Sequence, residues 1–524
     1  MEATPKAKLP RLALSSIAVI IMALGLALGA GLEKAQADEL TAGSPALAST
    51  PGADESYPLW VGDTQVTNAS TEGQGWKFTP ASGDKPATLD LNGYSYTGPG
   101  HEETLEDYDG EWEYYRHAPI FWNDDGELVV GLTGENSVVV TADTADGNAT
   151  EASAGEDDED PTHRYCGIFC AGSLTIRGTG SLAANAGGIE NGDAGIYAKG
   201  DVNIEGGSVS ATGYDYGIYS YEGTIAIGAD AGTVAAETTG GALSLHGISA
   251  EYGDVIIDGG TVIAKGYRGI SVGGDIVING GDVSAQCTVP ASYTTSIMAP
   301  CAIACNYGVL TVNGGTVTAK GHQFGIFAAR YPASGEKELV PGITINGGSI
   351  VAESRESESS GIGIDGCIMT VKGGSVQAVG TGEKAYGVSA NSSRGEPGNG
   401  LLVIEGGVES FVAQGPAGAI NADTGVKNAV AGFGYSNVAG TEGKAFIDAS
   451  TQSSDLSSHK RVVFPATATP AKTPTAGKEM VRAGAGGSRL PNAGDEAPYI
   501  VPAALIALAA ATLAFSVRTR AARP

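Results

Sequence analysis

The sequence predicts an all-β protein whose central part is a single-stranded, right-handed parallel β-helix, a solenoid in which each coil of short strands stacks on the next. Three observations lead to this fold class. A phrase containing a double glycine recurs along the chain, apolar and polar residues alternate within it, and glycine accounts for 80 of the 524 residues. Glycine disfavours helix interiors by roughly 1 kcal/mol each and suits tight turns.

The repeat is clearest in residues 201–213, which are followed by Tyr216-Gly217-Ile218. Similar phrases begin at Asp254, Val309, Ile343 and Met369, further copies surround Gly280 and Gly406, and weaker ones start near Ser173 and Thr224. These make about nine units over residues 166–448. A fixed period of this length is the signature of a repeat protein whose units bury their apolar faces against one another.

Each unit predicts three short strands. In the first two strands of one unit, Val202 and Ile204, then Val209 and Ala211, occupy alternate positions and share one face. The third strand surrounds Gly217-Ile218, and the double glycine allows a corner that needs a positive φ. Antiparallel sandwich repeats are the competing architecture, but units as short as 21 residues, from Gly259 to Gly280, are too small for a sandwich.

Residues 57–165 differ from the repeats, because they contain all four tryptophans. We expect an N-terminal β cap and irregular first coils there, since an open coil end is an unpaired sheet edge. Two acidic loops, at 102–113 and 151–160, interrupt this part.

The N-terminus predicts export. Residues 1–37 combine a basic start, an apolar run and Ala35-Gln36-Ala37, as in a secretory signal peptide cleaved after Ala37. An uncleaved N-terminal anchor is the alternative. Residues 38–56 are expected to be a flexible segment, and residues 449–489, rich in Ser, Thr, Ala and Pro, a disordered linker that crosses the wall.

The C-terminus has three parts: Leu490-Pro491-Asn492-Ala493-Gly494, an apolar segment at 499–517 and a basic tail. The apolar segment is long enough for a transmembrane helix. This layout resembles the LPxTG-type sorting signals of Gram-positive cell-wall-anchored surface proteins. The resemblance implies that a sortase cleaves between Ala493 and Gly494 and joins the chain to peptidoglycan. Ala493 replaces the commonest threonine, which leaves the sortase class open, and simple membrane anchoring is the alternative.

Charge excludes one class of partner. The formal net charge is -29, from 30 basic and 59 acidic residues. Nucleic-acid affinity depends on Lys and Arg side chains that neutralise phosphates, so we expect no nucleic-acid partner. Acidic surfaces keep exported proteins soluble and offer oxygen ligands to Ca²⁺.

The opening Tyr57-Pro58-Leu59-Trp60-Val61-Gly62, a Leu-Thr-Gly-Glu-Asn segment at 132–136 and the repeated Gly-Gly-x-Val-x-Ala-x-Gly phrase carry a second resemblance. Residues 57–448 resemble bacterial surface proteins described as carbohydrate-binding β-helix proteins, whose fold is similar to that of pectate lyases. The resemblance implies polysaccharide binding, with Ca²⁺ as a candidate cofactor, and does not require turnover.

Candidate site residues follow from chemistry at single positions. Aromatic rings that could stack on sugars are Tyr214, Tyr216, Tyr219, Tyr221 and Phe327, of which alternation points about half inward. Oxygen ligands for Ca²⁺ are dense at Asp107, Asp109, Glu111, Asp124 and Asp125. Of the six cysteines, Cys287 and Cys301 are the candidate disulfide, and the pairs Cys166 and Cys170, and Cys301 and Cys305, are expected to fill the interior.

The sequence therefore predicts a secreted, wall-anchored surface protein that binds carbohydrate or a host surface in the manner of an adhesin, without catalysis. A polysaccharide lyase acting on uronic-acid polymers is the first alternative, with Lys265, Arg268 and Lys320 as the available bases. A passive surface scaffold is the second. Neither the glycan nor the existence of a ligand follows from the residues.

Overall fold

A computed structural model of the chain describes residues 55–106, 113–142, 162–189, 192–240, 245–290, 299–328, 342–355, 361–390 and 400–467. Contacts divide the chain into two units, 1–55 and 56–524, and every strand belongs to the second unit, which is described by itself below. The described residues are all-β, as predicted, and they include no helix that could span a membrane. The signal peptide, the sorting motif and the 499–517 segment lie outside the described residues.

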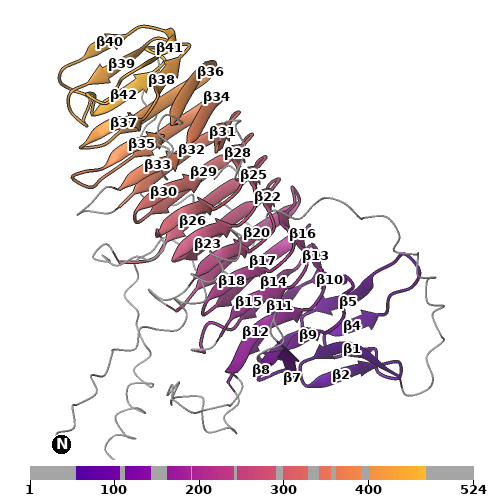
Figure 1. Ribbon diagram of the computed structural model, residues 1–524. Helices are drawn as coiled ribbons and strands as arrows, with labels where there is room; N and C mark the ends of the chain where they lie inside the picture. Colours follow the sequence, from indigo (N-terminus) through magenta and orange to yellow (C-terminus); the bar gives the residue numbers. More distant parts are fainter. Residues whose placement is uncertain are drawn as a thin grey trace, which may run out of the picture. The chain divides into compact units, whose positions relative to one another are not determined.

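Three series of parallel strands make up most of the unit (Figure 1). Sheet A contains β9 (Ile120–Trp122), β12 (Thr162–Cys170), β15 (Ala194–Ala198), β18 (Tyr216–Ser220), β21 (His246–Ala250), β24 (Arg268–Val272), β27 (Cys301–Cys305), β30 (Phe324–Ala328), β33 (Ile362–Gly366), β35 (Tyr386–Ala390) and β37 (Gly418–Ala422).

The other two series belong to a second large sheet. Series B1 contains β5 (Ala87–Asn92), β10 (Leu128–Thr133), β13 (Leu174–Gly178), β16 (Val202–Ile204), β19 (Ile225–Ile227), β22 (Val255–Ile257), β25 (Ile276–Ile278), β28 (Leu310–Val312) and β31 (Ile343–Ile345). Series B2 contains β6 (Ser95–Gly98), β11 (Glu135–Val140), β14 (Ser181–Asn185), β17 (Gly207–Gly213), β20 (Ala231–Thr238), β23 (Thr261–Gly266), β26 (Asp282–Cys287), β29 (Thr316–Gly321) and β32 (Ser349–Ser354). The long strands β34 (Ile368–Val379) and β36 (Leu401–Gln414) run through both series, and β38 (Gly425–Asn428) follows in B1.

The chain visits the series in the order B1, B2, A, and each strand pairs in parallel with its equivalent one repeat later. Thus β16 pairs with β19, β17 with β20, and β18 with β21. The parallel pairing that the repeats predict is confirmed, and the described residues of the repeats form no antiparallel sandwich. Two coils, β5-β6-β9 and β10-β11-β12, precede the nine that the sequence indicated.

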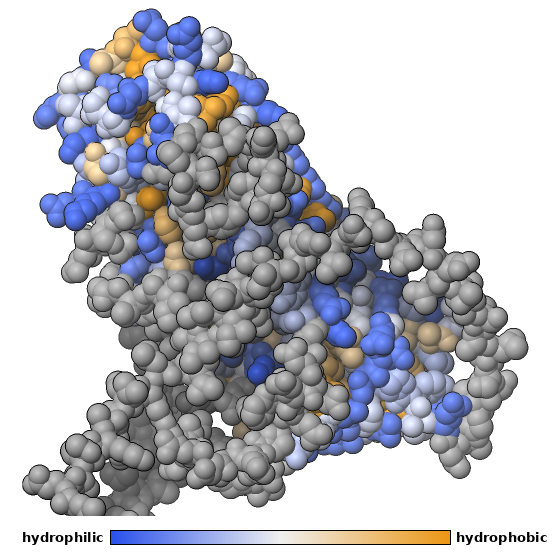
Figure 2. All heavy atoms as spheres, in the orientation of Figure 1, coloured by the Kyte–Doolittle hydropathy of each residue, from blue (hydrophilic) through white to orange (hydrophobic). Residues whose placement is uncertain are grey.

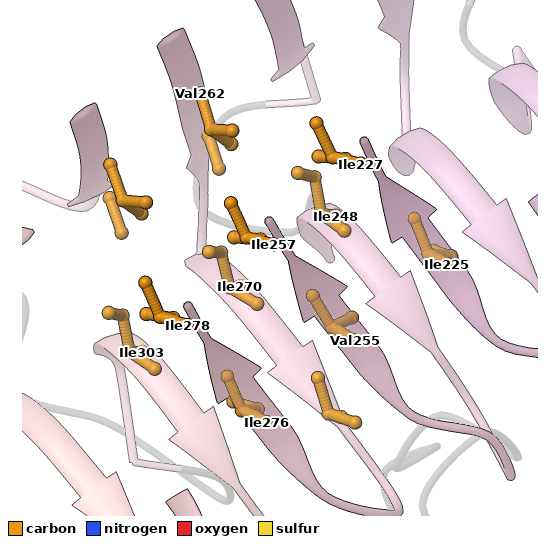
Figure 3. Packing of buried hydrophobic residues seen from close by; sticks show 14 of the residues in the cluster. Ile225, Ile227, Ile248, Val255, Ile257, Val262, Ile270, Ile276, Ile278 and Ile303 are labelled. Carbon is orange, nitrogen blue, oxygen red and sulfur yellow. The ribbon is translucent and has the colours of Figure 1, made fainter. Parts of the chain in front are cut away.

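Stacked aliphatic side chains form the core inside these series (Figure 3). Ile225, Val255 and Ile276 occupy one row of B1 positions, and Ile248 and Ile270 lie in a facing row of sheet A. All five are 0% exposed. Full burial of such a side chain stabilises the fold by roughly 1.5–3 kcal/mol. The alternation in the sequence correctly predicted the inward positions of B1 and B2.

The corner between B1 and B2 is stabilised by a ladder of side-chain amides. Asn279 donates to Asp258, Asn313 donates to Asn279, and Asn346 donates to Asn313, each at 2.7 Å. The double glycine follows this ladder, and its second member has a positive φ, such as 85° at Gly281. The positive φ angles expected of the double glycines are confirmed in every repeat copy except Gly406-Gly407.

Antiparallel strands lie at both ends of the parallel series. Before them come β1 (Ser56–Val61), β2 (Thr64–Thr67), β3 (Glu72–Gly73), β4 (Trp76–Thr79), β7 (His101–Glu106) and β8 (Glu113–Ala118). After them come β39 (Gly432–Tyr435), β40 (Ala445–Ile447), β41 (Ser450–Ser454) and β42 (Arg461–Phe464). β42 pairs with β36 and β39, and β41 pairs with β38. Residues 450–464 therefore contain two paired strands, β41 and β42, and are not the start of the linker that composition suggested.

Candidate functional site

The outer face of sheet A carries the polar and aromatic side chains of the repeats. In β18, Ile218 lies in the core, whereas Tyr216 and Tyr219 pack together on the outside, with ring centroids 4.3 Å apart. Gly217 explains this departure from alternation, because a Cβ at that position would lie 2.6 Å from backbone atoms of Glu237 and Gly247. The expectation that alternation points one of these two tyrosines inward is therefore wrong.

A row of aromatic rings crosses the first strands of this face. Phe121, Phe169, Tyr197 and Tyr219 are register partners on β9, β12, β15 and β18, with successive centroids 4.7, 5.4 and 5.3 Å apart. Trp60 packs against Phe121, and the Arg116 guanidinium lies 5.3 Å from the Phe169 centroid and 4.5 Å from that of Tyr197. Phe121 and Phe169 are buried in this row, whereas Trp60 and Tyr197 are half-buried.

The exposed rings lie further along, in the turns that leave sheet A. Tyr252 follows β21 and is 55% exposed, and Tyr307 follows β27 and is 68% exposed. Between them, the turn after β24 contains Gly273-Gly274, which carry no side chains, and then Asp275, whose carboxylate accepts a hydrogen bond from the Val309 amide at 2.7 Å. Because adjacent strands are about 4.8 Å apart, the turns that carry the two rings are separated by about 10 Å, with the two glycines between them. Two exposed aromatic rings therefore flank the turn after β24, and this position at Gly273-Gly274 is called the gap below.

Polar groups lie beside this gap. Arg268 is 6% exposed and donates from Nε to the Ala299 carbonyl at 3.2 Å, and from Nη1 to Ser271 at 3.2 Å and Asn306 at 3.0 Å. Asn306 directly precedes Tyr307. This network holds the Asn306 amide in place next to an exposed ring, as a site for sugar hydroxyls requires.

His246, the neighbour of Arg268 in the sheet, is a buried neutral group on the same face. Its Nδ1 lies 3.3 Å from the Ser249 hydroxyl, and within the described part of the chain its Nε2 has no hydrogen-bond partner. Burial, and secondly the charge of Arg268, hold the pKa of His246 well below its usual range. His246 therefore stays uncharged at neutral pH.

The predicted aromatic residues separate into two groups. Tyr216, Tyr219 and Tyr221 belong to one cluster. Tyr221 also packs against Tyr252, with the centroids of these two rings 5.1 Å apart. Phe327 lies four strands away, where it packs on Phe324. Tyr214 is half-buried in the turn before β18.

Sequence reasoning missed Tyr252 and Tyr307. The signal was present, because each is an aromatic residue that directly precedes a glycine in the turn after a predicted third strand.

The predicted Ca²⁺ ligands are not assembled by the described residues. Asp107, Asp109 and Glu111 lie outside them, and Asp124 accepts a hydrogen bond from the Gly126 amide at 2.8 Å within its own turn. Over the described ranges, the one group of three metal-ligating side chains is Glu102, His117 and His163. The sequence did not reveal it, because its members are distant along the chain.

Neither Cys287 nor Cys301 is disulfide-bonded in the structure, and both are buried. Cys287 packs with Tyr267 and Val289, and Cys301 packs with Ala304 and Phe324. Cys170 and Cys305 fill the core as expected, whereas Cys166 packs on the outer face. Burial raises the pKa of Cys170 and Cys301 to about 12, so these thiols are protonated.

Comparison with known proteins adds one finding. Residues 117–357 match a family described as carbohydrate-binding domain-containing protein, and this segment contains Tyr252 and Tyr307 but covers less than half of the chain. No curated protein and no solved structure matches the chain.

Proposed function

We propose that this protein binds an extracellular polysaccharide along the turns that leave sheet A, at the gap between Tyr252 and Tyr307. The observation that carries the proposal is the pair of exposed tyrosines on either side of Gly273-Gly274, within the segment that is similar to carbohydrate-binding proteins. The C–H faces of sugar rings pack on aromatic rings, and their hydroxyls need fixed polar partners such as the Asn306 amide. In Figure 2, hydrophilic and hydrophobic residues are interspersed over the coloured surface.

The test is binding to a panel of uronic-acid and neutral polysaccharides by affinity electrophoresis. Tyr252→Ala and Tyr307→Ala should each weaken retardation at least several-fold. Phe446→Ala is the matched control, because Phe446 is 60% exposed but lies on β40, away from sheet A. Equal retardation of all three variants and the unaltered protein would refute the site. Repeating the assay in chelator tests the Ca²⁺ dependence that the family resemblance implies.

We also infer that the parallel series close into a right-handed β-helix. The recurring order B1, B2, A and the single core that all three series share support this architecture. A closed coil presents the same face of sheet A repeatedly, which suits recognition of a repeating polymer.

The leader and the C-terminal tripartite sequence support display on a Gram-positive cell wall. Sortase would join the carbonyl of Ala493 to a wall amine, leaving the β unit outside the membrane. Release of the protein by muramidase, but not by detergent, is the expected result. Detergent extraction of the unaltered protein would instead indicate simple membrane retention.

We propose binding without turnover, with a polysaccharide lyase as the alternative. A lyase needs a free base near the sugar C–H group that loses its proton. Arg268 lies beside the gap, but its three hydrogen bonds hold it as a structural cation. Appearance of the ultraviolet absorbance of an unsaturated uronide on incubation with uronic-acid polymers would establish the lyase reading and overturn ours.

A further inference from the structure

Three neighbouring strands bring two histidines and a glutamate together beside the start of sheet A. Glu102 on β7 is the antiparallel partner of His117 on β8. β8 in turn pairs in parallel with β12, where Tyr115 is opposite His163 and His117 is opposite Tyr165. His117 and His163 are therefore diagonal neighbours on one face of the sheet, close enough for their side chains to meet.

Their ligand atoms converge on one point. His117 Nε2 lies 2.8 Å from His163 Nδ1 and 3.4 Å from Glu102 Oε2, and all three atoms lie within 4.8 Å of one another. Metal–ligand bonds of about 2.0–2.1 Å in a tetrahedral zinc site place neighbouring ligand atoms about 3.4 Å apart. The distance between Glu102 Oε2 and His117 Nε2 already fits, and the two imidazole nitrogens need to separate by about 0.6 Å, which side-chain rotation provides.

Packing orients both rings. Tyr165 stacks on His117 with centroids 4.4 Å apart and an interplanar angle of 16°, and Tyr115 lies 4.7 Å from His163. The His117 side chain is 1% exposed, whereas that of Glu102 is 44% exposed. The two tyrosines therefore hold the imidazole rings in place, and the Glu102 carboxylate lies on the solvent-exposed side of the three ligands.

Two imidazole nitrogens at 2.8 Å must share a proton. For both to bind a cation, each ring must carry its own proton on the far nitrogen, Nδ1 of His117 and Nε2 of His163. A divalent ion between them would then replace the shared proton, and water would complete the coordination. Imidazole nitrogen selects zinc and similar transition metals over Ca²⁺, which prefers oxygen ligands.

We propose that Glu102, His117 and His163 bind one divalent transition-metal ion, with Zn²⁺ as the best fit. The ion would link the β7–β8 hairpin to β12 and so brace the N-terminal end of sheet A. This site is separate from the carbohydrate gap, which lies on later repeats, and the inference does not depend on the proposed function.

The test uses the full chain, stripped of metal with a chelator and titrated with Zn²⁺ by calorimetry. We expect one ion per chain and a rise in Tm with Zn²⁺. Co²⁺ in its place should show the visible absorption of a cobalt ion bound by nitrogen and oxygen. Affinity should fall as the pH is lowered, because protons compete with the metal ion for the imidazole nitrogens.

Variants assign the ion to these residues. His163→Gln should weaken Zn²⁺ binding by more than about 100-fold, since loss of a ligand costs more than the 10–100-fold typical of its outer partners. Glu102→Gln, at an exposed position, should weaken binding without altering the metal-free Tm. His459→Gln is the control, because His459 lies near β42. Absence of binding by the unaltered chain, or unchanged binding by His163→Gln, would overturn the proposal.

Discussion

Arg116 holds the start of sheet A together through a buried ion pair, and its replacement by methionine should cost substantial stability. The side chain is 1% exposed and pairs through Nη1 with the Asp193 carboxylate and with Cys166 Sγ, the latter at 3.0 Å. Its guanidinium also lies over the Tyr197 ring. Methionine preserves much of the volume but leaves Asp193, itself 5% exposed, without this partner.

The expected loss in the free energy of unfolding follows from that geometry. Removing one partner of a buried ion pair costs about 3–5 kcal/mol, because the other charge stays buried. Arg164 Nη1 lies 3.9 Å from Asp193 and is half exposed, so it compensates in part and places the expected loss near the lower limit, about 3 kcal/mol. The double variant Arg116→Met with Asp193→Asn buries no unpaired charge, and it should recover at least about 1.5 kcal/mol.

Denaturant unfolding followed by tryptophan fluorescence suits this test. All four tryptophans lie between residues 60 and 122, and Trp60 packs on Phe121 near the ion pair. Fluorescence therefore reports on the end of the unit where Arg116 lies, even where later repeats unfold separately. If the double variant is as unstable as the sum of the two single variants, the pair is not coupled and the reasoning is wrong.

Three further predictions concern the core, one carboxyl group and the thiols. Ile257→Ala should lower the free energy of unfolding by about 2–5 kcal/mol, measured by denaturant titration, because the side chain is 0% exposed between stacked neighbours. Burial, opposed by a hydrogen bond with Ser389, raises the pKa of Asp365 from 3.8 to about 6, so the free energy of unfolding should fall as the pH rises from about 4 to about 6. The Tm of Asp365→Asn should lack this part of the pH dependence, and a variant with the same pH profile as the unaltered protein would contradict the prediction. In the absence of reductant, nearly no thiol should react with an alkylating reagent in the folded protein, and all six should react after denaturation. Only four reactive thiols after denaturation would instead demonstrate a Cys287–Cys301 disulfide.

Most of the fold could be predicted from the regular spacing of apolar residues and double glycines in the repeats. Residues such as Val202 and Ile204 repeat at fixed positions because every coil meets an equivalent coil, so local alternation and long-range pairing give the same answer. The end of the β unit was harder to place. Strands β41 and β42 are polar or short and pair antiparallel with β38, β36 and β39, and no repeat marks them.

The site depended more on tertiary structure. Tyr216 and Tyr219 share the outer face because Gly217 turns the strand against β20 and β21, which alternation alone does not show. Tyr252 and Tyr307 are 55 residues apart, yet pairing of β21, β24 and β27 places them two strands apart across Gly274.

By itself, the sequence determined the all-β class, the parallel repeats, the inward rows and the acidic charge, because these depend on residue type and spacing within one coil. Tertiary structure alone decided which side chains meet across coils. Pairing of β7, β8 and β12 brings Glu102, His117 and His163 together. Strand pairing likewise places Arg116 on β8 within hydrogen-bonding distance of Asp193, which directly precedes β15. The physical reason is that hydrogen-bonded register between strands, which no single coil encodes, sets the distances between side chains far apart in the chain.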